Sequence, residues 1–306
     1  MEQKIRDIFN QLGFPLVGFV GQDDAHLGPW VQPWLDRGYH GSMEWMTGNL
    51  GIREEPLSIH PGATSAIVLG MPYKNPAPDF LAQPERPLSR YAWGTDYHHW
   101  IRKRLKQGLA RLAEQFEGFD GRGFVDSAPV PEKILAHLGG LGFIGKNSLL
   151  THPTWGSYLF LSSVICNLPL TTTGPMDHPG CGTCDLCLDT CPNSAIMPGR
   201  QVNANRCISY LTIEVKGELT ATQEKATQGH LFGCDRCQDC CPYNQTADYA
   251  PTPNPFEFDQ RWADLSPEWV LSLDQAQFDQ LKITSPLKRA GLEGLRRNAL
   301  AGLGKK

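Results

Sequence analysis

Ten cysteines lie from Cys166 to Cys241, and seven of them fall into two regular runs. The first run, Cys-x2-Cys-x2-Cys-x3-Cys-Pro, begins at Cys181; the second, Cys-x2-Cys-x3-Cys-Pro, begins at Cys234 and has Cys207 upstream. This is the spacing of bacterial ferredoxins, in which the last cysteine of a run binds the other of two [4Fe–4S] clusters. The predicted ligand sets are Cys181, Cys184, Cys187 and Cys241 for one cluster, and Cys191, Cys207, Cys234 and Cys237 for the other.

Two cysteines remain outside these sets. Using Cys240 would break the x3-Cys-Pro spacing, and Cys166 is expected to be a buried thiol on a strand. Cysteine pairs two residues apart also bind zinc, so two zinc sites with four cysteine ligands each are the alternative. Zinc would not require the triple run followed by Cys-Pro. The spacing therefore favours iron–sulfur clusters, which pass single electrons to a neighbouring site.

The 306 residues divide into three segments of different pattern. Apolar residues at helical spacing predict helices at 1–13 and 97–117, and compact apolar runs predict strands at 15–20, 65–71 and 157–165. This alternation predicts a layered α/β (α+β) domain over 1–170. Cysteines dominate 171–250. Residues 251–306 predict a proline-rich linker and a short helical segment, in which 285–303 resembles one unit of a helical repeat.

Composition narrows the class of protein. Hydrophobic residues make up 41% of the chain, which supplies a core and excludes a disordered protein. The net charge of −4 argues against binding nucleic acid through overall charge. There is no signal-peptide pattern, and no apolar run approaches the roughly 20 residues that cross a bilayer. With the cysteines gathered in one region rather than spread as in a secreted disulfide scaffold, we expect a cytoplasmic monomer.

The chain resembles epoxyqueuosine reductases in four segments as well as in its cysteine spacing. The segments are 126–133 and 142–148, which are rich in polar residues and glycine, Ser-Arg-Tyr-Ala-Trp-Gly-Thr-Asp-Tyr-His at 89–98, and Cys-Ile-Ser-Tyr-Leu-Thr at 207–212. The resemblance implies a cobalamin-binding domain like that of reductive dehalogenases, a ferredoxin-like domain with two [4Fe–4S] clusters, and a HEAT-like C-terminal segment. It also implies that epoxyqueuosine at the wobble position of tRNA is reduced to queuosine, with electrons passing from an external donor through the clusters to cobalamin.

The resemblance assigns the proton donor to Asp126. Breaking a C–O bond with electrons creates an alkoxide, and a carboxylic acid sheltered from water can hold the proton that the alkoxide needs near neutral pH. The alternative is a helix cap or an Asx turn, because Asp-Ser-Ala-Pro is common turn chemistry. The resemblance also implies cobalamin contacts, several of them through backbone groups, at Arg53, Ser89, Asp126, Leu150, Leu161, Ser209 and Asp235. Residues 24–29, Asp-Ala-His-Leu-Gly-Pro, lack the spacing of a histidine that binds cobalt, which agrees with a base-off cobalamin.

Two segments carry local positive charge. Residues 272–306 hold seven Lys and Arg against three acidic residues, and 85–112 hold seven against two. Such patches can bind a phosphate backbone even on an acidic protein, although a solvated helix face is the alternative for each residue. Lys216 is a further candidate contact to tRNA. Chemistry on a base of an anticodon loop also requires that base to be splayed out into a pocket.

Three other functions compete with the tRNA enzyme. A reductive dehalogenase would use the same chemistry on small organohalides, but the missing export signal and the basic patches argue against it. A ferredoxin-type electron carrier would not need 165 residues free of cysteine. A zinc-bearing RNA-binding protein without catalysis would be distinguished by its iron content.

Overall fold

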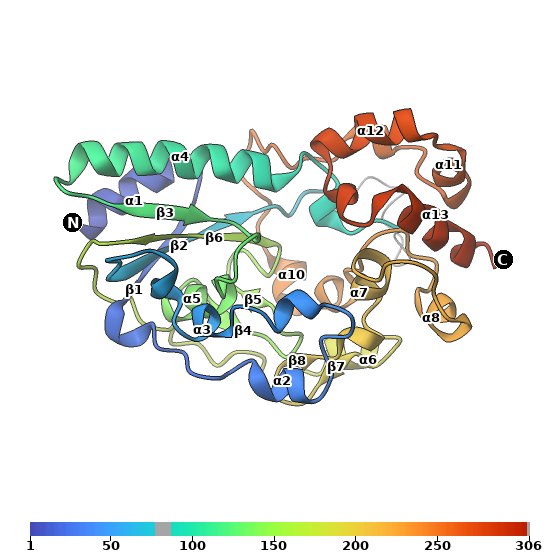
Figure 1. Cartoon of the computed structure of the whole chain (residues 1–306), viewed down its shortest axis with the longest axis horizontal. Helices are drawn as coiled ribbons and strands as arrows, with labels where there is room; N and C mark the ends of the chain where they lie inside the picture. Colours follow the sequence, from blue (N-terminus) through green and yellow to red (C-terminus); the bar gives the residue numbers. More distant parts are fainter. Residues whose placement is uncertain (77–86, 305–306) are drawn as a thin grey trace.

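The computed structural model describes residues 1–76 and 87–304 and centres on a four-stranded antiparallel sheet (Figure 1). The strand order is β1-β2-β6-β3, and the central pair aligns Ser65 with Cys166 and Pro72 with Leu159. The strands are β1 Leu16–Gly21, β2 Ser65–Pro72, β3 Gly121–Phe124 and β6 Leu159–Cys166. The strands predicted at 15–20, 65–71 and 157–165 are confirmed to within two residues.

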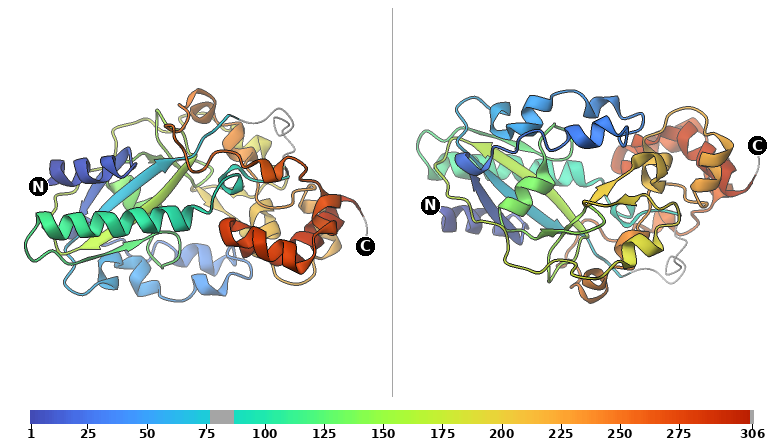
Figure 2. Two further views of the ribbon diagram at one scale, coloured as in Figure 1. Left: turned by 90° about the horizontal axis from the view of Figure 1, so that it is seen from above. Right: turned by 90° about the horizontal axis from the view of Figure 1, so that it is seen from below.

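Alternate residues of the strands enter two different apolar cores, as the two-residue repeat of a strand requires. In β2, Ile67 and Leu69 enter the core covered by α1 and α4, whereas Ala66 and Val68 enter the core on the α5 side. Figures 1 and 2 show α1 and α4 on one face of the sheet and α5 on the other. These helices are α1 Glu2–Gln11, α4 Tyr97–Gln115 and α5 Glu132–Leu138. The predicted layered α/β architecture is confirmed.

β3 returns along α4, so the end of the strand lies beside the start of the helix. The two elements are in close contact, because a side chain at Gly123 would come within 3.0 Å of Leu105. Just beyond the strand, Arg102 Nη2 donates to Ser127 Oγ at 3.1 Å. This arrangement places the loop after β3, where Asp126 lies, against the first turns of α4.

Short elements make up the rest of the N-terminal half and the cysteine-rich segment. In the N-terminal half they are η1 Gln22–Asp24, α2 Gln32–Asp36, η2 Glu44–Met46, α3 Leu50–Glu54, η3 Pro56–Ile59, η5 Arg90–Ala92, β4 Phe143–Ile144 and β5 Leu150–Thr151. In the cysteine-rich segment they are α6 Leu186–Thr190, β7 Ile196–Met197, β8 Gln201–Val202, η6 Ala204–Arg206, α7 Ile208–Ile213, α8 Ala221–Ala226, α9 Arg236–Asp239 and α10 Pro242–Thr246. α6 and α9, each lying within one cysteine run, contact each other.

The helical C-terminal segment docks on the body of the protein. Its elements are η7 Gln260–Trp262, α11 Pro267–Ser272, α12 Gln275–Thr284, η8 Pro286–Arg289 and α13 Gly291–Gly302. One apolar core joins Trp262 and Leu295 of this segment to Trp93 and Phe232. This core draws residues from all three predicted domains (1–170, 171–250 and 251–306), whose boundaries stay a prediction. Within residues 1–76 and 87–304, no helix has both the length and the apolar character to span a bilayer.

Candidate active site

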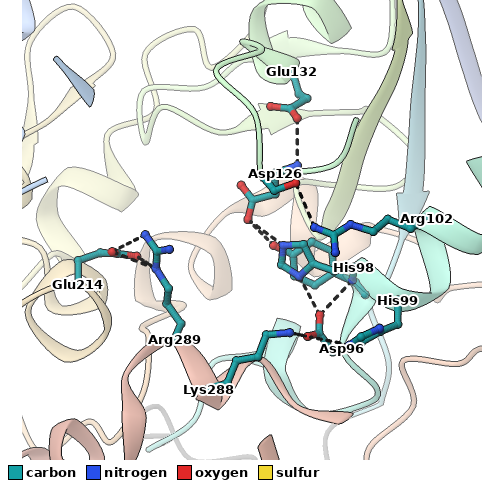
Figure 3. A network of polar contacts seen from close by, with 11 residues as sticks. Asp96, His98, His99, Arg102, Asp126, Glu132, Glu214, Lys288 and Arg289 are labelled. Carbon is teal, nitrogen blue, oxygen red and sulfur yellow. Dashed lines mark hydrogen bonds and ion pairs between the residues drawn. The ribbon is translucent and has the colours of Figure 1, made fainter. Parts of the chain in front are cut away.

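Asp126 lies in the loop between β3 and α5, at the centre of a polar network (Figure 3). Its backbone φ is 48°, a left-handed conformation that few residues other than glycine adopt. Tyr97 Oη donates to Asp126 Oδ2 at 2.5 Å, and His98 Nε2 lies 3.6 Å from the same oxygen. The helix-cap alternative is wrong, because Pro131 is the N-cap of α5. The side chain of Asp126 is 65% exposed, so the protein alone does not provide the expected shelter from water.

A second carboxylate holds the start of α4 in place. Asp96 is the N-cap of α4 and is fully buried; its Oδ1 accepts from the backbone N–H of His98 at 3.0 Å and lies 2.7 Å from His98 Nδ1. Lys288 of η8 forms an ion pair with the other oxygen of Asp96. The network therefore runs from the C-terminal segment through Asp96 and His98 to Asp126, as Figure 3 shows.

These contacts shift the pKa values of both partners. Burial would lower the pKa of His98, but its contacts with Asp126 and Asp96 outweigh burial and raise it above 6.5. Burial would raise the pKa of Asp96, but the bonds from His98 and Lys288 outweigh it and hold the pKa well below its ordinary value. The charged forms of Asp96 and His98 are therefore both favoured beside Asp126.

Glu132, the first residue of α5, supports the Asp126 loop. Its Oε1 accepts from the backbone N–H of Asp126 at 3.0 Å. Burial, reinforced by the negative charge of Asp126, raises the pKa of Glu132 to about 8. Arg53 also interacts electrostatically with Glu132. Residues 89–98 and 126–133 were singled out by resemblance alone, and spacing gave no reason to link Asp96, His98, Glu132 or Lys288.

The thiols of the cysteine region fall into two groups by their mutual electrostatic interactions. Burial raises the pKa of Cys241, and Cys181 and Cys184 add to the rise. Cys187 interacts with Cys240, Cys181 and Cys241. Cys241, the last cysteine of the second run, therefore lies close to the cysteines of the first run, as the crossed ligand sets require.

The second group contains the four remaining predicted ligands. Burial raises the pKa of Cys237, and the neighbouring Cys234, Cys207 and Cys191 raise it further. Across the described residues, no three Cys, His, Asp or Glu side chains lie close enough to share a single metal ion. A [4Fe–4S] cube binds its thiolates at separate iron corners, and the residues present fit that arrangement. Cys166 is a fully buried thiol in β6, as predicted.

Backbone amides already point at two of these sulfurs. The N–H of Lys146 lies 3.4 Å from Cys181 Sγ, and the N–H of Ala195 lies 3.3 Å from Cys191 Sγ. Hydrogen bonds to ligand sulfurs stabilise thiolates and tune cluster potentials. The sequence could not reveal these donors, because any residue except proline can supply a backbone N–H.

The residues expected at cobalamin lie in several separate elements. Ser89 Oγ donates to Asp235 Oδ1 at 2.7 Å, and the backbone N–H of Arg90 donates to the other oxygen of Asp235 at 2.6 Å. Leu150 of β5 and the half-buried Leu161 of β6 pack in the core on the α5 side. Asp126 lies in the network described above, and Ser209 is half-buried in α7.

Arg53 is the one residue of this set with an unmet hydrogen-bonding group within the described residues. It is buried in α3, and its Nε–H has no hydrogen-bond partner. A buried donor without an acceptor is costly, and an acceptor on a bound cofactor would satisfy it. Beside Arg53, the indole of Trp45 is 53% exposed. The site thus has an exposed aromatic surface and a free guanidinium donor close to the Asp126 loop.

The predicted basic patches differ in how their charges are used. Lys216 Nζ donates to the carbonyls of Ile213 and Arg289, where the C-terminal segment docks. In the C-terminal segment, Lys282, Lys288, Arg289, Arg296 and Arg297 all bind protein groups. Arg102 of the other patch, together with Arg122 of β3, lines a hollow of about 480 Å³ that also includes Ser127. Arg86, Lys305 and Lys306 lie outside the described residues.

Two family models match the chain in the regions described above. One, described as epoxyqueuosine reductase QueG, DUF1730, matches residues 53–127, and one described as a 4Fe-4S double cluster binding domain matches residues 180–244. The chain is 40% identical to an epoxyqueuosine reductase of Pseudomonas aeruginosa, over 99% of this chain and 85% of that protein.

Solved structures share the whole fold. One is epoxyqueuosine reductase with an epoxyqueuosine-modified tRNA-Tyr stem loop, with a TM-score of 0.88 and 26% identity over 98% of this chain and 80% of that chain. Another is epoxyqueuosine reductase from Bacillus subtilis with its catalytic aspartate loop swung out of the active site, with a TM-score of 0.87, 26% identity and the same coverage. These structures match 98% of this chain, so the predicted fold class is confirmed.

Proposed function

The chain belongs to the epoxyqueuosine reductase family, and we propose that it reduces the epoxide of epoxyqueuosine in tRNA to the cyclopentene of queuosine, with Asp126 as the proton donor. The reaction consumes two electrons and two protons for each epoxide and releases the epoxide oxygen as water. The tRNA substrate is supported by the relative that was solved with an epoxyqueuosine-modified stem loop.

The observation that carries the role of Asp126 is its place in the fold. It occupies a left-handed backbone position, keeps an exposed carboxyl group, and has a tyrosine hydroxyl and a histidine nitrogen directed at Oδ2. Residues held in sparsely populated conformations cluster at active sites. Bound substrate and cofactor would cover the exposed carboxyl group and supply the shelter from water that the protein alone does not.

The chain's own residues fit the expected cofactors. When bound, the two clusters supply single electrons from an external donor, and base-off cobalamin supplies a reducing cobalt centre at the epoxide. The eight cysteines in their two groups would hold the clusters. The buried, unpartnered Nε–H of Arg53 would donate to cobalamin, while Ser89 would be held in place by Asp235. We retain Leu150, Leu161 and Ser209 as further contacts of the cofactor.

We expect tRNA phosphates to contact positively charged side chains in two places. The Arg102–Arg122 hollow lies next to the Asp126 loop and offers guanidinium groups to a phosphate. Lys216 remains a proposed tRNA contact, although its ammonium group is bonded to two carbonyls in this structure. A replacement at either place should weaken tRNA binding more at low salt than at high salt if the contact is to phosphate, because the variant releases fewer counterions on binding.

The test uses anaerobically purified protein reconstituted with iron, sulfide and cobalamin. We expect about eight irons and one cobalt per chain, since two cubes hold four irons each. On epoxyqueuosine-containing tRNA with a chemical reductant, nucleoside analysis should show queuosine. Asp126→Asn should keep the metal content and tRNA affinity but lose about 10²- to 10⁴-fold in kcat, the usual range for removing a general acid. Zinc in place of iron, or an Asp126→Asn variant as active as the wild type, would overturn the proposal.

A further inference from the structure

The stoichiometry of the reaction demands more than Asp126 can supply alone. Reducing an epoxide to an alkene breaks two C–O bonds and takes up two protons, whereas one carboxylic acid carries one. Asp126 must therefore regain a proton within a turnover, while substrate and cofactor cover its exposed face. The group that recharges it has to lie beside the carboxyl and reach solvent on another side.

His98 meets both requirements. Its Nε2 lies 3.6 Å from Asp126 Oδ2, and its side chain keeps 18% exposure. Its other nitrogen, Nδ1, lies 2.7 Å from the buried Asp96 carboxylate. A carboxylate at Nδ1 fixes the proton there, so Nε2 becomes the nitrogen that gains and loses a proton. The ring is also held by stacking on Tyr97, at 4.1 Å between ring centroids.

The carboxylate that orients His98 is itself held from a distant part of the chain. Lys288 forms an ion pair with Asp96 Oδ2, and the backbone N–H of Asp96 donates to the carbonyl of Thr284 at 2.8 Å. Both partners belong to the C-terminal segment. The position of His98 therefore depends on docking of that segment as well as on α4.

On this geometry, and resting on the proposed function, we propose that His98 returns a proton to Asp126 between the two proton transfers of each turnover, with Asp96 and Lys288 as the residues that orient it. His98 acts through Asp126 and is thus a positioning and relay residue.

The proposed steps balance in atoms and charge. Two electrons enter from the external one-electron donor. Cleavage of the first C–O bond gives an alkoxide, which takes the proton of Asp126 and becomes a hydroxyl group. The Nε2–H of the His98 imidazolium then protonates the Asp126 carboxylate, and Asp126 gives this second proton to the hydroxyl as the second C–O bond breaks, water leaves and the C=C bond forms. Neutral His98 then regains a proton from solvent on its exposed side, and ionised Asp126 regains one once the product has left.

The charges around His98 set the expected pH dependence. Activity should fall with rising pH as the imidazolium loses its proton, above the ordinary 6.5 because the pKa of His98 is raised. Charged and titratable groups from three parts of the chain face His98. They are Asp96, Tyr97 and His99 at the start of α4, Asp126 and Glu132 in the β3–α5 loop and the first turn of α5, and Lys288 and Arg289 in η8.

The experiment measures kcat and KM for tRNA against pH in reconstituted holoenzyme. In His98→Gln, we expect kcat to fall about 10²-fold, with KM unchanged and the alkaline limb of the kcat profile absent. Added imidazole should restore activity to His98→Ala, which a purely structural role would not allow. His26→Gln is the matched control, since His26 is 61% exposed, pairs with Glu55 and is not part of the Asp126 network; it should keep the wild-type kcat.

Replacing the two orienting residues should shift the alkaline limb of the kcat profile in opposite directions. Asp96→Asn keeps an oxygen to cap α4 but removes a negative charge, so the limb should move to lower pH. Lys288→Met removes a positive charge, so the limb should move to higher pH. A wild type that leaves the epoxide unreduced would defeat the proposed function itself. An active wild type with a His98→Gln variant of equal kcat and unchanged pH profile would defeat the relay alone.

Discussion

The sheet region and the cysteine region of this chain are stabilised in different ways. All eight residues of β2 are buried, and both faces of the sheet carry an apolar core. In the cysteine region the helices are four to six residues long, and the small cluster around Leu211 contains three buried residues. Helices this short are unstable without tertiary support. Iron–thiolate bonds must therefore supply much of the support that apolar burial supplies to the sheet.

The Asp126 network and the predicted cluster sites differ in the same way. The Asp126 network is complete in hydrogen bonds made by the polypeptide itself, from α4, the β3–α5 loop and the C-terminal segment. The chain brings the thiols together in two groups, and a bound cluster would join the four thiols of each group. The Asp126 network should consequently survive treatments that dismantle the clusters.

The largest expected effect comes from removing iron. A chelator that strips the clusters should abolish reduction and raise amide hydrogen exchange across residues 181–246, because metal binding there is also folding energy. β2 and β6 should stay protected. Hydrogen exchange followed by mass spectrometry measures both regions in one sample, and equal loss of protection in both would remove the distinction.

Two adjacent cysteines sharpen this test. Cys241→Ser should lose one cluster, about four irons, because Cys241 is a predicted ligand. Cys240→Ser should keep all the iron, because Cys240 lies outside both ligand sets. Iron analysis and the visible spectrum read the result. Iron loss in Cys240→Ser with retention in Cys241→Ser would show that the ligand sets are wrong.

A smaller effect is expected inside the catalytic network. Tyr97→Phe removes the hydroxyl that donates to Asp126 but keeps the ring, which stacks on Phe160 at 4.3 Å between centroids. We expect kcat to fall about 10- to 100-fold, since a hydrogen bond to a charged group contributes about 1.5–3 kcal/mol. KM for tRNA, iron content and melting temperature should be unchanged. A fall in melting temperature with normal kcat would mean that the hydroxyl serves stability alone.

A buried asparagine, Asn298, helps to dock the C-terminal segment on the body of the protein. Asn298 is fully buried, and its Nδ2 donates to the carbonyls of Thr212 and Leu231, each at 2.8 Å. Asn298→Ala leaves both carbonyls unpaired and should destabilise the protein by about 2 kcal/mol. Gln275→Ala, an exposed amide on the same segment, is the control and should change stability little. Chemical denaturation compares the two variants.

The last effect concerns Glu132 and is confined to high pH. Folding raises its pKa from 4.5 to about 8, chiefly by burial and also by the charge of Asp126. Between these values the folded chain binds more protons than the unfolded chain, so this residue lowers stability as pH rises through that window. Glu132→Gln keeps the acceptor for Asp126 N–H and removes the titration. We expect a melting temperature several degrees higher than wild type at pH 9 and equal at pH 4, since each pKa unit corresponds to about 1.4 kcal/mol; a gain of the same size at both pH values would contradict the shift.

The sequence predicted best what depends on local spacing. The cysteines of each run repeat every three or four residues and indicated the double cluster domain, and strands such as 65–71 and the helix at 97–117 have clear apolar periodicity. It could not predict contacts that depend on tertiary structure. Lys288 and Asp96 are 192 residues apart and meet because the C-terminal segment folds back on α4. Asp126 was identified from resemblance, and its environment, exposed and flanked by Tyr97 and His98, required the three-dimensional structure.

The core around Trp93 has a consequence for biosynthesis. Trp93, with 1% exposure, packs among residues from three parts of the chain, and the last of these parts, from Trp262 to Ala299, leaves the ribosome last. Because chains fold from the N-terminus as they emerge, all eight predicted ligand thiols are outside the exit tunnel before this core can close. Iron loading can therefore precede closure of this core, and ribosome-bound chains in which Trp262 has not yet left the exit tunnel should already accept iron but leave Trp93 accessible to water.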